Sequence, residues 1–325
     1  MTQRRRLFSP DSFWNAPIPP DPEVDPRSEH YIGHWEKEPT GGLHINANSF
    51  AVPVYDVDAS TPLRTVAQRP TSPEAQARSV TRRCEFRHGE SFPERVPIPD
   101  HAIPDPAGDN HIGLVDWERG LAWDMWGALK LEDGSWQSYT GMHYSIDGPG
   151  VFKTSDFDVE NGDSIHYHGP GRASGVPVIA GLAMRHEIAS GRIEHKLSFA
   201  ARYNGYQRFT FPAAWTDGRY VDGLPEGAVV QLDPDLDLDR FELTDAGRVI
   251  CRALQEYGMV NVDGAAGTPV YVEGLYGDPE HSWDGLLDEN ELKQIPVRHF
   301  RVLKMDSITP MGDGRKGLRL ELPSD

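Results

Sequence analysis

The chain has 325 residues, enough for one large all-β domain or two smaller ones. Its composition, with 25% charged and 38% hydrophobic residues, is typical of a soluble globular protein. The formal net charge of −18 argues against nucleic acid as the main partner, because phosphate contacts need an excess of Lys and Arg. The same charge weakly disfavours polyanionic substrates, unless a local basic groove overrides the total.

The N-terminal segment 1–40 is rich in Pro and predicts an extended arm that wraps the core, with Phe13, Trp14 and Ile18 as anchors. Its first residues, MTQRRRLFSPDSFWNAPIP, are basic but lack the apolar stretch of an intact signal peptide. We therefore expect an extracellular protein if a leader has been removed, and otherwise a cytoplasmic one. No run of about eighteen apolar residues occurs, so we expect no transmembrane helix and no membrane partner.

Prolines and glycines interrupt short apolar runs along the chain, which is typical of an all-β protein with many turns. The run HINANSFAVPVYDVD at 44–58 predicts a strand. Residues 68–92 lack periodicity and predict a long surface excursion. A basic groove there is the alternative to a solvated loop, which is the simpler interpretation of its arginines: Arg78, Arg82, Arg83 and Arg87.

Residues 110–146 predict a three-stranded meander, with strands near 110–117, 121–130 and 136–146. The connections Glu-Arg-Gly and Glu-Asp-Gly-Ser have good turn chemistry. Side chains alternate between the two faces of a strand. On the second strand, Asp124 and Trp126 therefore share one face, while Trp123 and Met125 share the other.

Helical patterns follow the meander. Residues 176–190 have Pro177 near the first turn and Gly191 at the end, as expected of a helix. We expect a second short helix over 193–201 and a third from Thr244 to Tyr257, which Gly258 terminates. The segments MVNVDG and PVYVEG predict a hairpin.

We find no internal repeat and no clean linker, and therefore expect one β-rich domain over 1–325. Its predicted fold is mainly β, an antiparallel β-sandwich or jelly-roll-like domain with two or three helices. Cys84 and Cys251 form no CxxC metal or redox motif. Cys251 is most simply explained as a buried thiol, and a long-range disulfide between Cys84 and Cys251 is the alternative.

His166 and His168 form the sharpest local motif, because an HxH strand places two imidazoles on one face. With a third ligand from His111, His143 or Asp124, they predict a divalent metal site. Metal-free catalytic histidines and ordinary surface histidines are the alternatives, so no cofactor is required.

Asp124 stands out because strand interiors are depleted in Asp. A carboxylate between tryptophans has a raised pKa suited to acid catalysis, unless Asp124 points to solvent. Asp109 places another carboxylate close to His111 in sequence. We predict proton transfer or positioning by His111 and His143, and a sugar-binding cleft lined or supported by Trp123, Trp126 and Trp136.

Arg172 and Ser174 precede the helix expected over 176–190, whose free N–H groups would favour an anion beside Arg172. Ser174 is better explained as a helix cap than as a nucleophile. His195 lies on a predicted helix and faces either the cleft or the core. The acidic run Asp233–Asp239 lacks the pattern of an EF-hand loop, and an amphipathic edge explains it better than calcium.

Several segments resemble a widespread set of uncharacterised, mostly secreted bacterial proteins. They are SFWNAPIPPDPEVDP (12–26), FAVPVYDVDASTP (50–62), DNHIGLVDWERGLAWDMW (109–126), RASGVPVIAGL (172–182), GRIEHKLSFA (191–200) and LPEGAVVQLDPDLDLD (224–239). The resemblance implies a secreted, β-rich protein and attaches no reaction. His111, Asp124, Ser174 and His195 fall inside these motifs, whereas His166 and His168 lie outside them.

The expected function is a carbohydrate-active enzyme that cleaves glycosidic bonds of a polysaccharide or oligosaccharide. In a glycoside hydrolase, Asp124 would be the acid or base. In a polysaccharide lyase, His166 or Tyr144 would be the base, and Arg172 would neutralise a uronate carboxylate. A metal-dependent enzyme using the His-x-His strand and a non-catalytic glycan-binding protein are the alternatives. The sequence leaves the substrate and the oligomeric state open.

Overall fold

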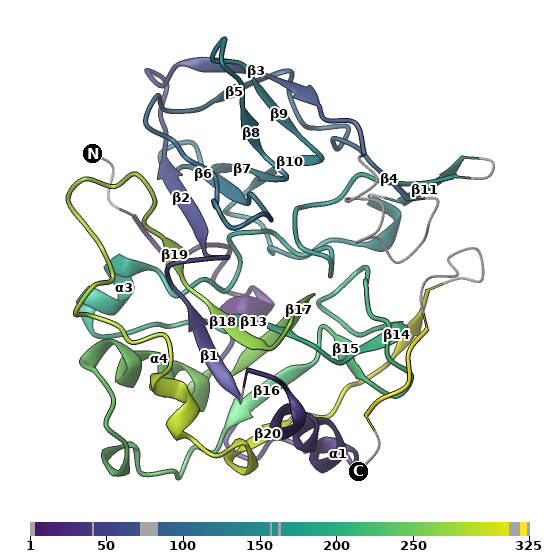
Figure 1. The fold of residues 1–325 in the computed structure, drawn as a ribbon, viewed down its shortest axis with the longest axis vertical. Helices are drawn as coiled ribbons and strands as arrows, with labels where there is room; N and C mark the ends of the chain where they lie inside the picture. The colour runs from purple at the N-terminus through teal and green to yellow at the C-terminus, as the bar shows by residue number, and fades with distance from the viewer. Residues whose placement is uncertain are drawn as a thin grey trace.

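The computed structural model describes residues 4–40, 42–71, 84–156, 158–161, 164–311 and 319–323 (Figure 1). The predicted mainly β, sandwich-like fold is confirmed: most regular structure lies in curled sheets, with a few short helices around them. Two larger sheets organise the chain. The first has the strand order β10 (Thr140–Ser145), β7 (Leu121–Trp126), β6 (Ile112–Asp116), β2 (Val52–Asp56) and β19 (Glu273–Gly274).

The second large sheet mixes parallel and antiparallel pairs. Its order is β1 (Leu43–Asn46), β18 (Thr268–Tyr271), β13 (Leu197–Ala201), β17 (Met259–Gly264), β16 (Val229–Leu232) and β20 (Phe300–Val302). Strand β13 is fully buried, and it runs parallel to β17 and antiparallel to β18. It therefore separates two strands that are close in sequence.

Three smaller sheets make up the rest of the β-sheet structure in the described residues. One consists of β11 (Asp158–Asn161), β12 (Ser164–Tyr167) and β4 (Cys84–Phe86). Another consists of β15 (Leu224–Glu226), β14 (Asn204–Phe209) and β21 (Thr309–Pro310). The third has the order β5 (Arg95–Pro97), β3 (Leu63–Gln68), β9 (Trp136–Ser138) and β8 (Leu129–Lys130). In Figure 1, β4 and β11 lie above β14 and β15 on one side of the molecule.

Among the described residues, the α-helices are α1 (Ser28–Gly33), α3 (Arg185–Ser190) and α4 (Asp245–Glu256). The 3-10 turns are η1 (Phe13–Asn15), η2 (Trp35–Lys37), η3 (Thr154–Asp156), η4 (Leu238–Arg240), η5 (Glu291–Gln294) and η6 (Val297–His299). Helix α4 confirms the prediction for 244–257, because the Thr244 hydroxyl accepts the Gly247 N–H and Gly258 follows with φ of 75°. No helix in the described part of the chain has the length and apolar character needed to cross a membrane.

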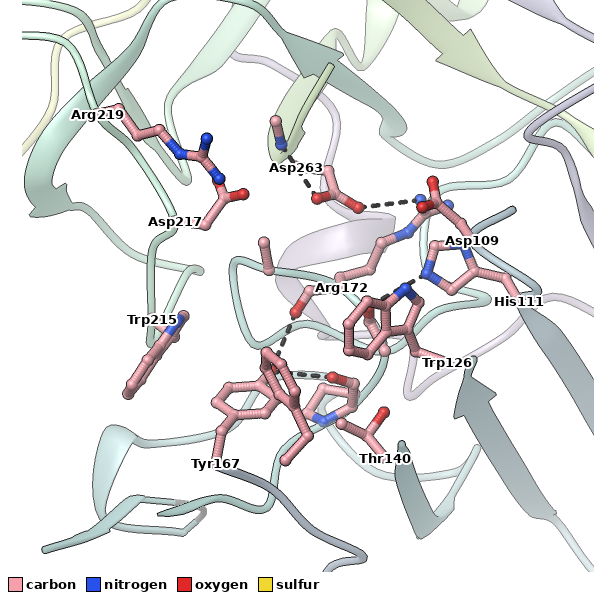
Figure 2. A pocket seen from close by; sticks show the side chains of 15 residues that line it. Asp109, His111, Trp126, Thr140, Tyr167, Arg172, Trp215, Asp217, Arg219 and Asp263 are labelled. Atoms are coloured by element: carbon pink, nitrogen blue, oxygen red, sulfur yellow. Dashed lines mark hydrogen bonds and ion pairs between the residues drawn. The ribbon is translucent and has the colours of Figure 1, made fainter. Parts of the chain in front are cut away.

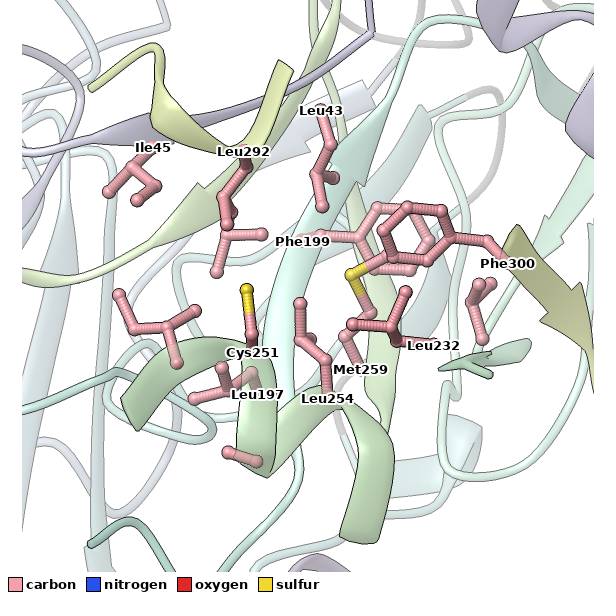
Figure 3. Packing of buried hydrophobic residues seen from close by; sticks show 14 of the residues in the cluster. Leu43, Ile45, Leu197, Phe199, Leu232, Cys251, Leu254, Met259, Leu292 and Phe300 are labelled. Atoms are coloured by element: carbon pink, nitrogen blue, oxygen red, sulfur yellow. The ribbon is translucent and has the colours of Figure 1, made fainter. Parts of the chain in front are cut away.

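Helix α4 packs its apolar face on the second sheet (Figure 3). Ile250, Cys251 and Leu254 are buried among strand residues such as Phe199 and Met259. Cys251 is a free, buried thiol, as predicted, whereas the side chain of Cys84 lies outside the described residues. Met259, at the start of β17, is part of this packing.

The three-stranded meander is confirmed, since β7 pairs antiparallel with both β6 and β10. Its third segment divides, because β9 joins β3 and β8 in another sheet. The predicted hairpin of 259–264 and 269–274 is wrong. Both segments contain strands, but β13 lies between them.

Two predicted helices are also wrong. Only Arg185–Ser190 of the segment 176–190 is helical. Gly181 has φ of 68° and approaches β13 so closely that an added Cβ would lie 2.4 Å from Ser198 Oγ, which breaks a helix there. Residues 197–201 form the central strand β13, because a short apolar run buried on both faces has no periodicity that separates strand from helix.

The described residues of the N-terminal segment, predicted as an extended arm over 1–40, contact distant parts of the chain. Trp14 is buried and donates its indole N–H to Gly150 O at 2.8 Å. Ile18 N–H bonds Glu256 O at the end of α4, and Asp25 N–H bonds Val302 O in β20. The arm is not wholly extended, because it includes α1 and two 3-10 turns.

Leu254→Ala should lower the free energy of unfolding by about 2–5 kcal/mol, because it leaves a cavity under α4. The matched control is Leu63→Ala on β3, where 50% of the side chain is exposed and the change should stay within about 0.5 kcal/mol. Equal losses for the two variants in urea unfolding would contradict this packing.

Candidate functional site

A cavity of about 210 Å³ opens where the two large sheets meet the smaller ones (Figure 2). Its wall combines aromatic, acidic and basic side chains from distant parts of the chain. They include Phe86, Asp109, His111, Trp126, Thr140, Tyr167, Arg172, Trp215, Asp217, Arg219 and Asp263. We call this cavity the acidic pocket.

The first sheet supplies one wall of the pocket from residues at one end of three neighbouring strands. Trp126 ends β7, Thr140 begins β10 opposite it, and His111 directly precedes β6. Asn110 has φ of 52° and donates its side-chain N–H to Asp105 O. This bend lets both Asp109 and His111 line the pocket, although neighbouring residues of a regular strand would face opposite ways.

The loop 170–173 supplies the floor. Tyr167 Oη donates to Pro170 O at 2.9 Å and lies 3.0 Å from Arg172 O. His111 Nε2 donates to Gly171 O at 3.1 Å. Gly171 has no room for a side chain, because an added Cβ would lie 2.6 Å from Val178 Cγ2 and 3.1 Å from Trp126 Cβ. The loop is thus held in one position against β7.

Arg172 carries a buried positive charge into the pocket. Its Cζ lies 3.6 Å from the centre of the Tyr271 ring, and its Nη1 lies 3.5 Å from Asp263 Oδ2. Nε and Nη2 are buried and have no hydrogen-bond partner among the described residues. Buried donors are normally satisfied, so these two nitrogens indicate a place for an acceptor from a ligand.

Asp217 and Asp263 flank Gly264. The Gly264 N–H donates to Asp263 Oδ1 at 3.0 Å, and a Cβ added at Gly264 would lie 3.0 Å from Asp217 Oδ1. Asp263 comes from the end of β17, and Asp217 from the segment after β14. The two carboxyl groups therefore share one small region of the pocket wall.

Burial raises the pKa of Asp263 to about 8, with repulsion from Asp217 adding to burial and the Arg172 guanidinium opposing it. Burial also raises the pKa of Asp217, but Arg219 and a hydrogen bond from Glu226 lower it in turn. Glu226 itself has a pKa well above its usual value, because it is buried beside both aspartates. The cluster therefore holds protons at neutral pH.

His111 is neutral in this environment. Burial and the nearby Arg172 lower the pKa of His111 to about 3. Since Nε2 donates to Gly171 O, the proton resides there and Nδ1 is an acceptor, without a partner among the described residues. His111 can accept a hydrogen bond from a ligand hydroxyl.

Asp124 does not line the pocket. It is fully buried behind the loop, and its Oδ2 accepts hydrogen bonds from Val178 N–H at 2.9 Å and Tyr144 Oη at 3.1 Å. Burial raises the pKa of Asp124 to about 7, in the direction predicted. Its contacts, and those of Tyr144, hold the segment after Arg172 against β7 and β10.

Several predicted site residues lie apart from the acidic pocket. Trp123 and His143 stack on the opposite face of the sheet, with ring centres 5.0 Å apart. Trp136 is buried in the same apolar cluster as Trp123. Of the predicted catalytic and sugar-binding residues, the pocket wall contains His111, Trp126 and Arg172.

His195 lies before β13 rather than on a helix. Its Nδ1 donates to Lys196 O at 2.8 Å, and its Nε2 lies 3.1 Å from Glu187 Oε2 in α3. Burial lowers the pKa of His195, but the Glu187 carboxylate outweighs burial and the pKa is raised. Ser174 caps no helix, since none begins there. Its N–H bonds Val262 O instead.

The predicted metal pair is only partly visible. The side chain of His166 lies outside the described residues. His168 follows the end of β12, and its Nδ1 donates to His88 O at 2.9 Å. No group of three His, Cys, Asp or Glu side chains suited to a metal occurs within the described ranges.

Two other charged segments carried predictions, and the second, with Arg78, Arg82 and Arg83, lies mostly outside the described residues. In the run 233–239, Asp233 and Asp237 accept backbone N–H groups two residues ahead, which fits the predicted edge rather than calcium. Of the arginines between 78 and 87, only Arg87 is described, and it pairs with Glu85.

We compared the chain with models of known protein families, with curated proteins and with solved structures, and found no match in any of the three. The acidic pocket must therefore be interpreted from its own chemistry.

Sequence reasoning missed Asp217, Asp263 and Trp215. The segment WTDGRY carried a usable signal, because it places an aromatic, an acid and a base around one glycine turn. Asp263 was hidden by the predicted hairpin, in which it would lie in an exposed turn.

Asp124→Ala should destabilise the protein by about 2–4 kcal/mol, because it leaves two buried donors without an acceptor. Asp124→Asn keeps a side-chain oxygen for Val178 N–H and should lose much less. Thermal unfolding of both variants measures the difference. An Asp124→Ala variant as stable as the wild type would contradict the structural role.

Proposed function

We propose that this protein is a carbohydrate-active enzyme that cleaves a glycosidic bond in the acidic pocket. The observation that carries the proposal is the Asp217–Asp263 pair, two carboxyl groups in one small region with different electrostatic neighbours. Paired carboxyls are the usual groups for glycoside hydrolysis, because one donates a proton while the other acts as base or nucleophile.

In the proposed mechanism Asp263 is the general acid. Its raised pKa keeps the proton at neutral pH, ready for the leaving glycosidic oxygen. We assign Asp217 as the base or nucleophile, since Arg219 and the hydrogen bond from Glu226 oppose the effect of burial on its pKa. Two carboxyls share a hydrogen bond only when one is protonated, which assigns that proton to Glu226.

Aromatic side chains support a sugar ligand. Trp126 and Trp215 line the pocket together with Tyr167 and Phe86. Aromatic faces stack on the apolar C–H faces of sugar rings. The neutral His111 Nδ1 would accept a sugar hydroxyl, and Arg172 would bind a further oxygen. These groups orient a ring beside the carboxyl pair.

The lyase form of the reaction is the second candidate, and the unpartnered nitrogens of Arg172 favour it. A guanidinium there would neutralise a uronate carboxylate and ease loss of the adjacent proton. Tyr144 is a poor base for this step, because it is buried behind the pocket and bonded to Asp124.

A panel of polysaccharides should reveal activity. We expect new reducing ends, with no ultraviolet absorbance from an unsaturated uronate, on at least one substrate. Absorbance together with reducing ends would favour the lyase. Binding without any product would instead support a glycan-binding protein. Activity that dialysis against a chelator abolishes, and a divalent metal restores, would support the metal-dependent alternative.

Asp263→Asn and Asp217→Asn should each lower kcat by roughly a hundredfold or more, because each removes a proton-transfer group. The matched control is Asp235→Asn, an exposed aspartate of the run 233–239, which should leave kcat unchanged. Near-normal rates in both pocket variants, with product still formed, would refute the assignment.

The pH profile of kcat/KM should be bell-shaped. Activity should fall as the pH rises through about 8, because Asp263 then loses the proton that it donates. It should also fall in acid, as Asp217 becomes protonated. A rate that stays constant well above this pH would exclude Asp263 as the acid.

A further inference from the structure

A second cavity, of about 290 Å³, adjoins the acidic pocket. The two share Asp217, Arg219 and Gly264 in their walls. Arg202, between β13 and β14, lines only the second cavity, as do Asn204 and Tyr220. We call it the basic annex. The shared residues place the two cavities next to each other, and we refer to the pair as one path.

Arginines recur along this path. Arg172 lies in the acidic pocket, Arg219 lines both cavities, and Arg202 lines the basic annex. Arg202 is half-buried, and its Nη1 donates to Ala266 O at 3.1 Å. In a chain of net charge −18, the path brings these three guanidinium groups together with three carboxyl groups, those of Asp109, Asp217 and Asp263.

The wall of the basic annex includes the acidic side chain of Asp217. It is half-buried at the boundary with the acidic pocket, where Arg219 offsets its charge. Beyond that boundary, the ionisable side chains in the annex wall are Arg202 and Tyr220. The annex therefore favours an anionic group, which Arg binds well through paired hydrogen bonds to a carboxylate.

We propose that the substrate is an acidic glycan, in which the sugar next to the cleaved bond carries a carboxylate bound by Arg202 and Arg219. This inference rests on the proposed function, because it assigns the scissile bond to the boundary between the two cavities. One sugar lies in the acidic pocket beside Trp126 and Trp215. The uronate unit lies in the basic annex.

The position of the carboxyl pair is consistent with this arrangement. Asp217 and Gly264 form the boundary between the two cavities. Asp263, the proposed proton donor, directly precedes Gly264 in the chain. A glycan that spans both cavities thus presents its linking oxygen to the acid–base pair. The unpartnered nitrogens of Arg172 offer a second anion contact in the acidic pocket.

The test compares uronate trisaccharides (galacturonate, glucuronate and mannuronate) with their carboxyl-reduced neutral counterparts. Binding to the full chain is followed by calorimetry and tryptophan fluorescence, and cleavage is measured separately. We expect at least one acidic trisaccharide to bind about tenfold or more tightly than its neutral counterpart. Added salt should weaken this preference.

Arg202→Gln and Arg219→Gln should each reduce the preference about tenfold, whereas the exposed control Arg240→Gln should leave it unchanged. Arg202→Lys, which keeps the charge without the paired hydrogen bonds, should retain part of the preference. Thermal unfolding identifies any variant that has lost its fold, and the lysine variant then provides the comparison.

The outcomes separate the two proposals. Preferential binding of an acidic trisaccharide without cleavage supports the basic annex and overturns the glycosidic reaction. Cleavage of neutral glycans with no acidic preference, or a preference that the arginine variants do not alter, overturns the annex and leaves the reaction standing. Absence of both binding and cleavage overturns both.

Discussion

The rest of the site depends on the contacts of the buried Arg172 guanidinium with Asp263 and Tyr271. A buried positive charge is costly unless charges and hydrogen bonds surround it. Here Asp263 lies 3.5 Å away, the Tyr271 ring lies under Cζ, and the loop 170–173 is fixed by Tyr167 and His111. Because these partners come from both large sheets, satisfying one charge also brings the walls of the acidic pocket together.

The charge of Arg172 also changes the pKa values of the neighbouring groups. Arg172 opposes ionised His111 and favours ionised Asp263, while burial and neighbouring carboxyls keep the pKa of Asp263 near 8. Burial raises the pKa of Asp217, whereas Arg219 and Glu226 lower it. The two aspartates therefore have different electrostatic neighbours, although burial raises the pKa of both. Arg172 Nε and Nη2, which have no partner among the described residues, favour a ligand with several oxygen atoms.

The sequence predicted local structure better than long-range assembly. The meander, α4 and the N-terminal arm were predictable, because strand alternation, turn residues and helix caps act over a few positions. His111, Trp126 and Arg172 were among the predicted site residues, and they line the acidic pocket. Asp217 and Asp263 were not predicted, because Asp263 ends a strand that β13 separates from β18, and Asp217 comes from the segment after β14. Asp124 was chemically unusual as expected, yet its partners place it behind the pocket.

The central claim is that a carboxyl group in the acidic pocket keeps its proton at neutral pH. Carbon-13 NMR of protein labelled at the aspartate carboxyl carbons measures this directly. The account predicts one resonance that titrates near pH 8 and disappears in Asp263→Asn. If every aspartate resonance titrated below about pH 5, as in exposed carboxyls, the electrostatic account of the site would be contradicted.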